Sequence, residues 1–163
     1  MATRTSDPEI PMREYEQRRT KLMRAIGKSV GLVFAGTHDD HLNDTFRPHP
    51  HFEYLTGVTT EPGAILMIDP SHPHEARRAI LYLRPLNPEL EQWDGLRSPI
   101  SAALRDACGV RTIYRTAALG RFLNEAVQRS QRLVCLHPLA QYNQPISPDL
   151  KIFRDVMERV PGV

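Results

Sequence analysis

The fold of this chain is decided by the stretch from Asn43 to Pro62, which reads NDTFRPHPHFEYLTGVTTEP. Pro48 and Pro50 each fix their own φ angle and disfavour helix for the residue before them, so the stretch is expected to begin extended. The alternating residues that follow predict a short strand over 52–56, with Phe52 and Tyr54 on the same face. We interpret both aromatic rings as core residues.

Turn residues and apolar runs around this stretch predict the other elements. Gly57 ends the predicted strand, and Glu61-Pro62-Gly63 forms a turn before a buried strand over 64–68. Helices are expected over 11–26, over 99–108 with Ser98 as N-cap and Pro99 at the first position, and over 119–126. Further strands are expected over 30–35, 79–83, 110–114 and 133–136. A last helix is expected to turn five side chains inward: Ile152, Phe153, Val156, Met157 and Val160.

The order of these elements predicts an α/β fold with a mixed sheet flanked by helices. The strands over 64–68 and 79–83 are close in sequence and are expected to form an antiparallel meander. The later strands alternate with helices, which indicates a parallel βαβ part. Residues 1–10 are expected to be a flexible N-terminus, followed by one domain over 11–163.

Composition excludes several classes of protein. The 163 residues carry a net charge of +2, with 40% hydrophobic and 25% charged residues, as in ordinary globular proteins. The pairs Arg18-Arg19 and Arg77-Arg78 are interpreted as solvated faces, so we expect no nucleic-acid partner. The chain has no apolar run long enough for a membrane span. Its two cysteines, in apolar segments without metal-ligand spacing, indicate reduced residues of a cytoplasmic protein.

A cluster of possible metal ligands lies between residues 38 and 51. His38-Asp39-Asp40-His41 is followed by Asp44, His49 and His51, and imidazoles and carboxylates are ligands of zinc and manganese. Adjacent residues on a turn-rich loop do not converge as helical i, i+4 pairs do. We therefore expect a solvated loop, with no metal site in this chain.

Two motifs together resemble the N-terminal domain of aminopeptidase P, the Xaa-Pro aminopeptidases. The first comprises Asp44-Thr45-Phe46-Arg47, then Phe52-x-Tyr54-Leu55-Thr56-Gly57, then Glu61-Pro62. The second is Glu91-Gln92-Trp93-Asp94-Gly95, which is similar to the family's Glu-x-Trp-x-Gly. The resemblance is firm over 15–97 and implies the N-terminal domain fold shared with creatinase and prolidase.

The resemblance also implies roles for particular residues. Trp93 would help to form the wall of the substrate pocket, where an aromatic face suits a proline ring. Asp44 would approach the free amino terminus of the substrate, whose positive charge a carboxylate offsets. Arg47 would be structural, its guanidinium bonding to nearby carbonyls or a carboxylate. The remaining motif residues would be structural as well: Phe52, Tyr54, Gly57, Glu91 and Gly95.

By the same resemblance, the parent protein would release the N-terminal residue that precedes proline in a peptide. Two manganese ions, held by a C-terminal metallopeptidase domain absent from these 163 residues, would activate the water and polarise the carbonyl. This domain would support a homo-oligomer and shape the pocket, and would be inactive by itself. Two alternatives stay open: a stand-alone, non-catalytic interaction domain, and the same domain of a prolidase- or creatinase-like hydrolase.

Overall fold

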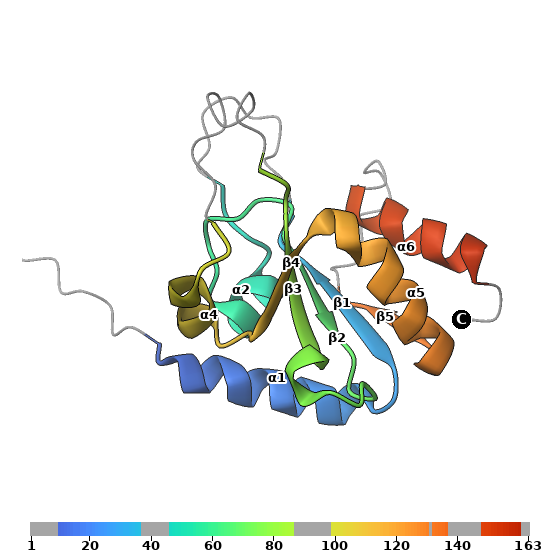
Figure 1. Cartoon of the computed structure of the whole chain (residues 1–163), viewed down its shortest axis with the longest axis horizontal. Helices are drawn as coiled ribbons and strands as arrows, with labels where there is room; N and C mark the ends of the chain where they lie inside the picture. Colours follow the sequence, from blue (N-terminus) through green and yellow to red (C-terminus); the bar gives the residue numbers. More distant parts are fainter. Residues whose placement is uncertain (1–9, 37–45, 87–98, 131, 137–147, 161–163) are drawn as a thin grey trace, which may run out of the picture.

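A five-stranded sheet between two groups of helices forms the centre of the molecule. The computed structural model describes residues 10–36, 46–86, 99–130, 132–136 and 148–160. In Figure 1, α2 and α4 lie at one side of the sheet and α5 and α6 at the other. Among the described residues, no helix combines the length and apolar character that crossing a membrane requires.

The sheet is mixed, as the sequence predicts. Its strand order is β4-β3-β2-β1-β5. The central three strands form an antiparallel meander, in which Val33 of β1 faces Leu66 of β2 and Leu66 faces Leu81 of β3. The outer strands pair in parallel, β4 with β3 and β5 with β1. The strands are β1 (Val30–Phe34), β2 (Ile65–Ile68), β3 (Ala79–Leu83), β4 (Thr112–Arg115) and β5 (Leu133–Cys135).

The helices cover both faces of the sheet and leave a separate apolar core on each. They are α1 (Met12–Ile26), α2 (Pro50–Thr56), α4 (Ala102–Cys108), α5 (Leu119–Ser130) and α6 (Pro148–Arg159). Short 3₁₀ turns lie at η1 (Glu75–Arg77) and η2 (Thr116–Ala118). Side chains of α1, α2 and α4 pack on one face, and those of α5 and α6 on the other. The meander is apolar on both faces because both are buried.

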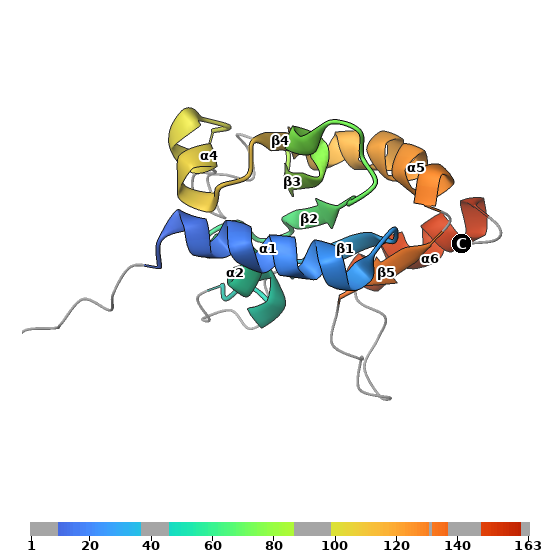
Figure 2. The same cartoon turned by 90° about the horizontal axis from the view of Figure 1, so that it is seen from below.

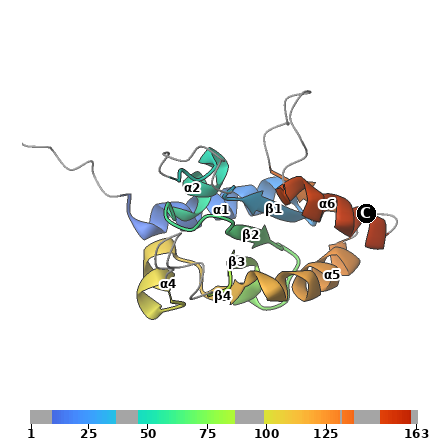
Figure 3. The same ribbon diagram turned by 90° about the horizontal axis from the view of Figure 1, so that it is seen from above.

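The three helices of the first face pack against one another. Figure 2 shows α1 running between α4 and α2, and α1 contacts both. Seen from above, α5 and α6 lie at the end of the molecule away from α2 and α4 (Figure 3). The first core therefore joins α1, α2 and α4 to one face of the sheet, whereas the second joins α5 and α6 to the other face.

The strand predicted over 52–56 is wrong, because these residues form helix α2. Pro50 occupies the first turn, where proline is favoured, and Gly57 at φ 68° ends the helix in the left-handed conformation. Phe52 and Leu55 are buried three positions apart, as on one helical face. Tyr54 is 54% exposed, so its interpretation as a core residue is wrong too.

Two smaller predictions about helices also need correction. Helix α4 begins at Ala102, and its N-cap is Ser101, whose hydroxyl accepts a hydrogen bond from the Leu104 N–H at 3.2 Å. A serine N-cap was correctly expected, but the predicted N-cap, Ser98, lies three residues before the actual one. In α6, Val156 is buried as expected. Met157 is 48% exposed, because consecutive residues of a helix point in different directions and Met157 is turned away from the buried face.

Candidate functional site

The sequence places its two substrate-binding candidates in segments that leave the same edge of the sheet. Strands β1, β3 and β5 run in one direction, so all three end at one edge. The chain leaves β1 at Phe34 before the segment that holds Asp44, and leaves β3 at Leu83 before the segment that holds Trp93. Both candidates, with Glu91 and Gly95, lie outside the described residues. Their roles stay predictions.

Backbone hydrogen bonds hold the described part of this edge. The Ala35 N–H donates to the Ala64 carbonyl at 2.9 Å, and the Gly63 N–H donates to the Gly36 carbonyl at 2.7 Å. Gly63 has φ +72°, and a Cβ there would lie 2.6 Å from the Arg84 Cδ. Glycine is therefore needed both for its backbone angle and for the passage of the Arg84 side chain. These contacts fix the described residues just after β1 and just before β2.

Arg47 lies at the start of the next described segment, and its side chain is exposed. Within the described residues its guanidinium makes no hydrogen bond or ion pair, so the structural role inferred from the resemblance stays a prediction. The other described motif residues with a predicted structural role belong to helix α2 or, for Gly57, to its C-cap. Phe52 is fully buried in the first core, and Gly57 lies so close to α1 that a Cβ would be 2.5 Å from the Tyr15 ring.

Tyr54 supports the same helix pair from the outside. The Arg18 guanidinium lies 4.2 Å from the centre of the Tyr54 ring, and its Nη1 donates to the Tyr54 carbonyl at 3.1 Å. Arg18 also pairs with Glu14 on its own helix at 3.1 Å. The motif therefore uses Phe52 to fill the core and Tyr54 to hold α1 from the surface.

The structure reveals a buried arginine. Arg19 is only 3% exposed, so the interpretation of Arg18-Arg19 as a solvated face is wrong for Arg19. Its Nη1 donates to the carbonyls of Leu55 at 2.7 Å and Cys108 at 3.0 Å, and its Nη2 donates to the Gly109 carbonyl at 2.8 Å. These carbonyls belong to the C-terminal ends of α2 and α4, where a cation is favoured. A signal was present: Arg19 lies four residues after Tyr15 and three before Leu22, within the apolar stripe of α1.

The arrangement around Arg19 is structural rather than reactive. Burial lowers the pKa of the Arg19 guanidinium, although the neighbouring Cys108 and Glu16 oppose this shift. An arginine nevertheless keeps its charge in proteins. Burial likewise raises the pKa of the Cys108 thiol, which disfavours the nucleophilic thiolate. In the part of the chain that the structure describes, no three His, Cys, Asp or Glu side chains converge on a possible metal position.

The comparison with known proteins identifies the family. The profile of "Aminopeptidase P, N-terminal domain" matches residues 15–135, most of the chain. The chain belongs to this family. The resemblance inferred from the two motifs is thereby confirmed, together with the mixed-sheet fold.

Relatives of this aminopeptidase P N-terminal domain are peptidases. The Xaa-Pro aminopeptidase of Haemophilus influenzae is 34% identical over 99 residues, covering 58% of this chain and 22% of that protein. The structure of Pseudomonas aeruginosa aminopeptidase PepP matches with a TM-score of 0.71 and 25% identity, over 92% of this chain and 32% of that one. Aminopeptidase P from E. coli, solved with the inhibitor Pro-Leu, matches at 0.67 and 23% identity, over 93% and 33%. This chain thus spans between a fifth and a third of these relatives.

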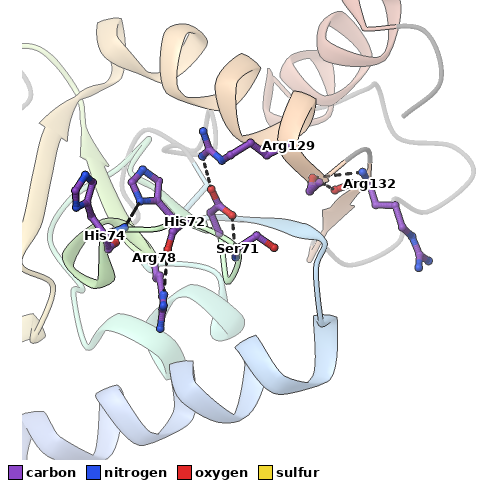
Figure 4. Close-up of polar contacts among 8 residues, drawn as sticks. Ser71, His72, His74, Arg78, Arg129 and Arg132 are labelled. Atoms are coloured by element: carbon purple, nitrogen blue, oxygen red, sulfur yellow. Dashed lines mark hydrogen bonds and ion pairs between the residues drawn. The ribbon is translucent and has the colours of Figure 1, made fainter.

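A second polar cluster of the aminopeptidase P N-terminal domain lies at the opposite edge of the sheet, between β2 and β3 (Figure 4). Asp69 is fully buried; its Oδ2 accepts from Arg129 Nη2 of α5 at 2.6 Å and its Oδ1 from the Ser71 N–H at 3.1 Å. Nδ1 of the largely buried His72 accepts from the His74 N–H at 3.0 Å, and Arg78 Nε donates to the His72 carbonyl at 3.2 Å. The cluster fixes the β2–β3 turn and ties it to α5.

His72 should make the stability of this domain depend on pH. Burial and the nearby positive charge of Arg129 lower the pKa of His72 from its ordinary value of 6.5, although Asp69 opposes the shift. As the pH falls through 6.5, His72 is therefore protonated more readily in the unfolded chain than in the folded one. The stability that the neutral His72 contributes is present above pH 6.5 and is lost below it. We expect His72→Asn, which keeps a possible acceptor for the His74 N–H, to lose less stability than the wild type between pH 7.5 and 5.5.

Urea unfolding at the two pH values measures this difference. His51→Asn is the matched control, because it makes the same substitution at an exposed histidine outside the β2–β3 turn. Equal losses of unfolding free energy in His72→Asn and the wild type would show that His72 titrates alike in the folded and unfolded chain.

Proposed function

We propose that this chain is the N-terminal domain of an Xaa-Pro aminopeptidase, an enzyme that releases the N-terminal residue preceding proline. Membership of the aminopeptidase P N-terminal domain family carries this proposal. The name of the Haemophilus influenzae relative and the Pro-Leu inhibitor bound to the E. coli enzyme support the substrate class. The activity itself would require a metallopeptidase domain alongside this one.

In this proposal the metal chemistry lies outside the present 163 residues. A zinc-substituted form of the E. coli enzyme, solved with product, supports a metal-dependent reaction. We propose manganese, two ions, as the metal of the parent enzyme, bound by its metallopeptidase domain. Bound there, the ions would supply an activated water and polarise the scissile carbonyl.

The part of this domain in the reaction would be to shape the substrate pocket. We propose that Trp93 stacks on the proline ring and that Asp44 offsets the charge of the free amino terminus. Support comes from the sheet, because the chain leaves the same edge toward both residues. We further propose that the domain contributes to contacts in a homo-oligomer. We also propose a cytoplasmic location, which the two cysteines support because they lie in apolar segments without metal-ligand spacing.

The role of Trp93 is tested in the full-length enzyme. Trp93→Ala should lower kcat/KM for an Xaa-Pro peptide about 10- to 200-fold, the range for losing one apolar pocket contact. Steady-state kinetics with added manganese measures the change. Tyr54→Ala, which removes an exposed aromatic ring from α2, is the control and should leave kcat/KM unchanged.

Each outcome separates the candidate functions. Wild-type kinetics in Trp93→Ala would remove this residue from the pocket, while hydrolysis of Xaa-Pro peptides would still support the proposed enzyme. A metal-loaded full-length protein that hydrolyses no such peptide would contradict the enzyme and favour the non-catalytic interaction domain.

A further inference from the structure

Strand β4 is the outermost strand on one side of the sheet, and a groove lies beside it. β4 pairs with β3 on one side, and within the described ranges no strand pairs with its other side. A groove of about 490 Å³ follows this edge. We call it the β4 groove; its walls include Thr112–Tyr114 of β4, His74 and Arg77 at the η1 turn, Arg105 of α4 and the preceding Arg111.

The β4 groove is positively charged. Three arginines and a histidine line it, and no carboxylate of the described residues does. Arg77, Arg105 and Arg111 form no ion pair with any described residue, whereas other arginines in the described part, such as Arg129, do pair with acids. Glu75, the acidic residue of the η1 turn, lines a different hollow, together with residues of α1. The groove therefore favours a ligand with several negative charges.

The arginines flank the strand edge on both faces of the sheet. Tyr114 packs on the α5 side, where its ring stacks on Phe122 at 4.9 Å, and the Arg77 guanidinium lies 6.0 Å from the same Phe122 ring. Arg105 comes from α4, whose Cys108 packs in the core on the other face. A strand added beside β4 would direct successive side chains to alternate faces, toward Arg77 on one and Arg105 on the other.

We propose that the β4 groove binds an extended acidic peptide segment of a partner protein, which adds to the sheet as a sixth strand. Backbone hydrogen bonds to β4 would hold the segment, and adjacent Glu or Asp residues would pair with the arginines on the two faces. A second copy of this chain fits less well, because it would bring the same unpaired arginines to the contact. The proposal goes beyond the peptidase function and does not depend on it.

The probe for this site is a fluorescein-labelled peptide, VEEVEEV, whose paired acids point to both faces of a strand. Anisotropy titrations with the 163-residue chain at low salt measure its Kd. We expect Arg77→Gln combined with Arg105→Gln to weaken binding at least about tenfold, an effect that one or two lost charge-assisted pairs produce. The control is a second double variant, Arg24→Gln with Arg132→Gln, which removes two positive charges from exposed arginines outside the groove. This variant should bind the peptide like the wild type. Circular dichroism verifies that every variant is folded.

Strand addition is tested separately from charge attraction. The peptide with alternate amides N-methylated keeps its charge but loses one hydrogen-bonding edge, so it should bind at least about tenfold more weakly. Amide NMR shifts on adding the unmodified peptide should centre on Thr112–Arg115.

The proposal is overturned if the methylated peptide or the neutral VQQVQQV binds as tightly as VEEVEEV, or if the double variant binds VEEVEEV as tightly as its control variant does. It is also overturned if inorganic phosphate displaces the peptide better than sodium chloride of equal ionic strength, which indicates a simple anion site. A β4-mediated dimer in sedimentation without peptide would assign the edge to a second copy.

Discussion

Replacement of Arg19 by methionine is expected to lower the free energy of unfolding by at least about 3 kcal/mol, because three hydrogen bonds of about 1 kcal/mol or more are lost together. Methionine fills much of the same volume but donates nothing to the carbonyls of Leu55, Cys108 and Gly109. These carbonyls lie at two helix ends that Arg19 shields from water. Urea unfolding of the 163-residue chain measures the loss.

Two further variants separate the hydrogen bonds of Arg19 from its charge. Arg24→Met changes an exposed arginine of the same helix and should stay within about 0.5 kcal/mol of the wild type. Arg19→Lys keeps the charge but lacks the planar guanidinium that reaches carbonyls on two elements, so its stability should lie between those of wild type and Arg19→Met. A Lys variant as stable as the wild type would show that charge alone is sufficient.

Phe52→Ala should cost about 3–5 kcal/mol, the range for removing a buried aromatic ring and leaving a cavity. The Phe52 side chain is fully buried in the first core, between helix α2 and the sheet. The expected result is a lower urea midpoint with an unchanged slope, since the cavity changes stability without changing the surface exposed on unfolding.

Tyr54→Ala is the informative partner of this variant, because it separates a helix from a strand. If residues 52–56 formed the alternating strand, Phe52 and Tyr54 would share a face and both changes would be costly. On α2 they point in different directions, and Tyr54→Ala should cost about 1 kcal/mol or less, mostly through its Arg18 contact. Similar large losses in both variants would contradict the helix.

The sequence predicted the sheet better than the helix at its motif. The apolar runs of β1, β2 and β3 are buried on both faces, and such runs are recognisable without any partner. Helix α2 has only seven residues and begins at Pro50, so its sequence carries too little periodicity to decide between a helix and a strand. The deciding facts are tertiary: the Tyr15 ring against Gly57 and the Arg19 bond to Leu55 come from α1, 36 or more residues earlier.

The candidate site could be predicted only as a set of residues. The motifs pointed to Asp44 and Trp93, and the strands that precede them in the sequence, β1 and β3, end at the same edge of the sheet. The apolar stripe of α1 could have indicated that Arg19 is buried, but no local pattern identifies the groups to which it donates. Its partners are backbone carbonyls, which every residue has, so no complementary acid in the sequence marks them.

Arg19 also has a consequence for how the protein is made. Its most distant acceptor, the Gly109 carbonyl, is 90 residues further along the chain. At about 5–20 residues per second, a ribosome needs roughly 5–20 seconds to add those residues. Helix α1 is thus synthesised before α4, and its central arginine cannot reach all its acceptors until α4 has emerged. During those seconds α1 lacks part of the contact that buries Arg19 in the folded domain.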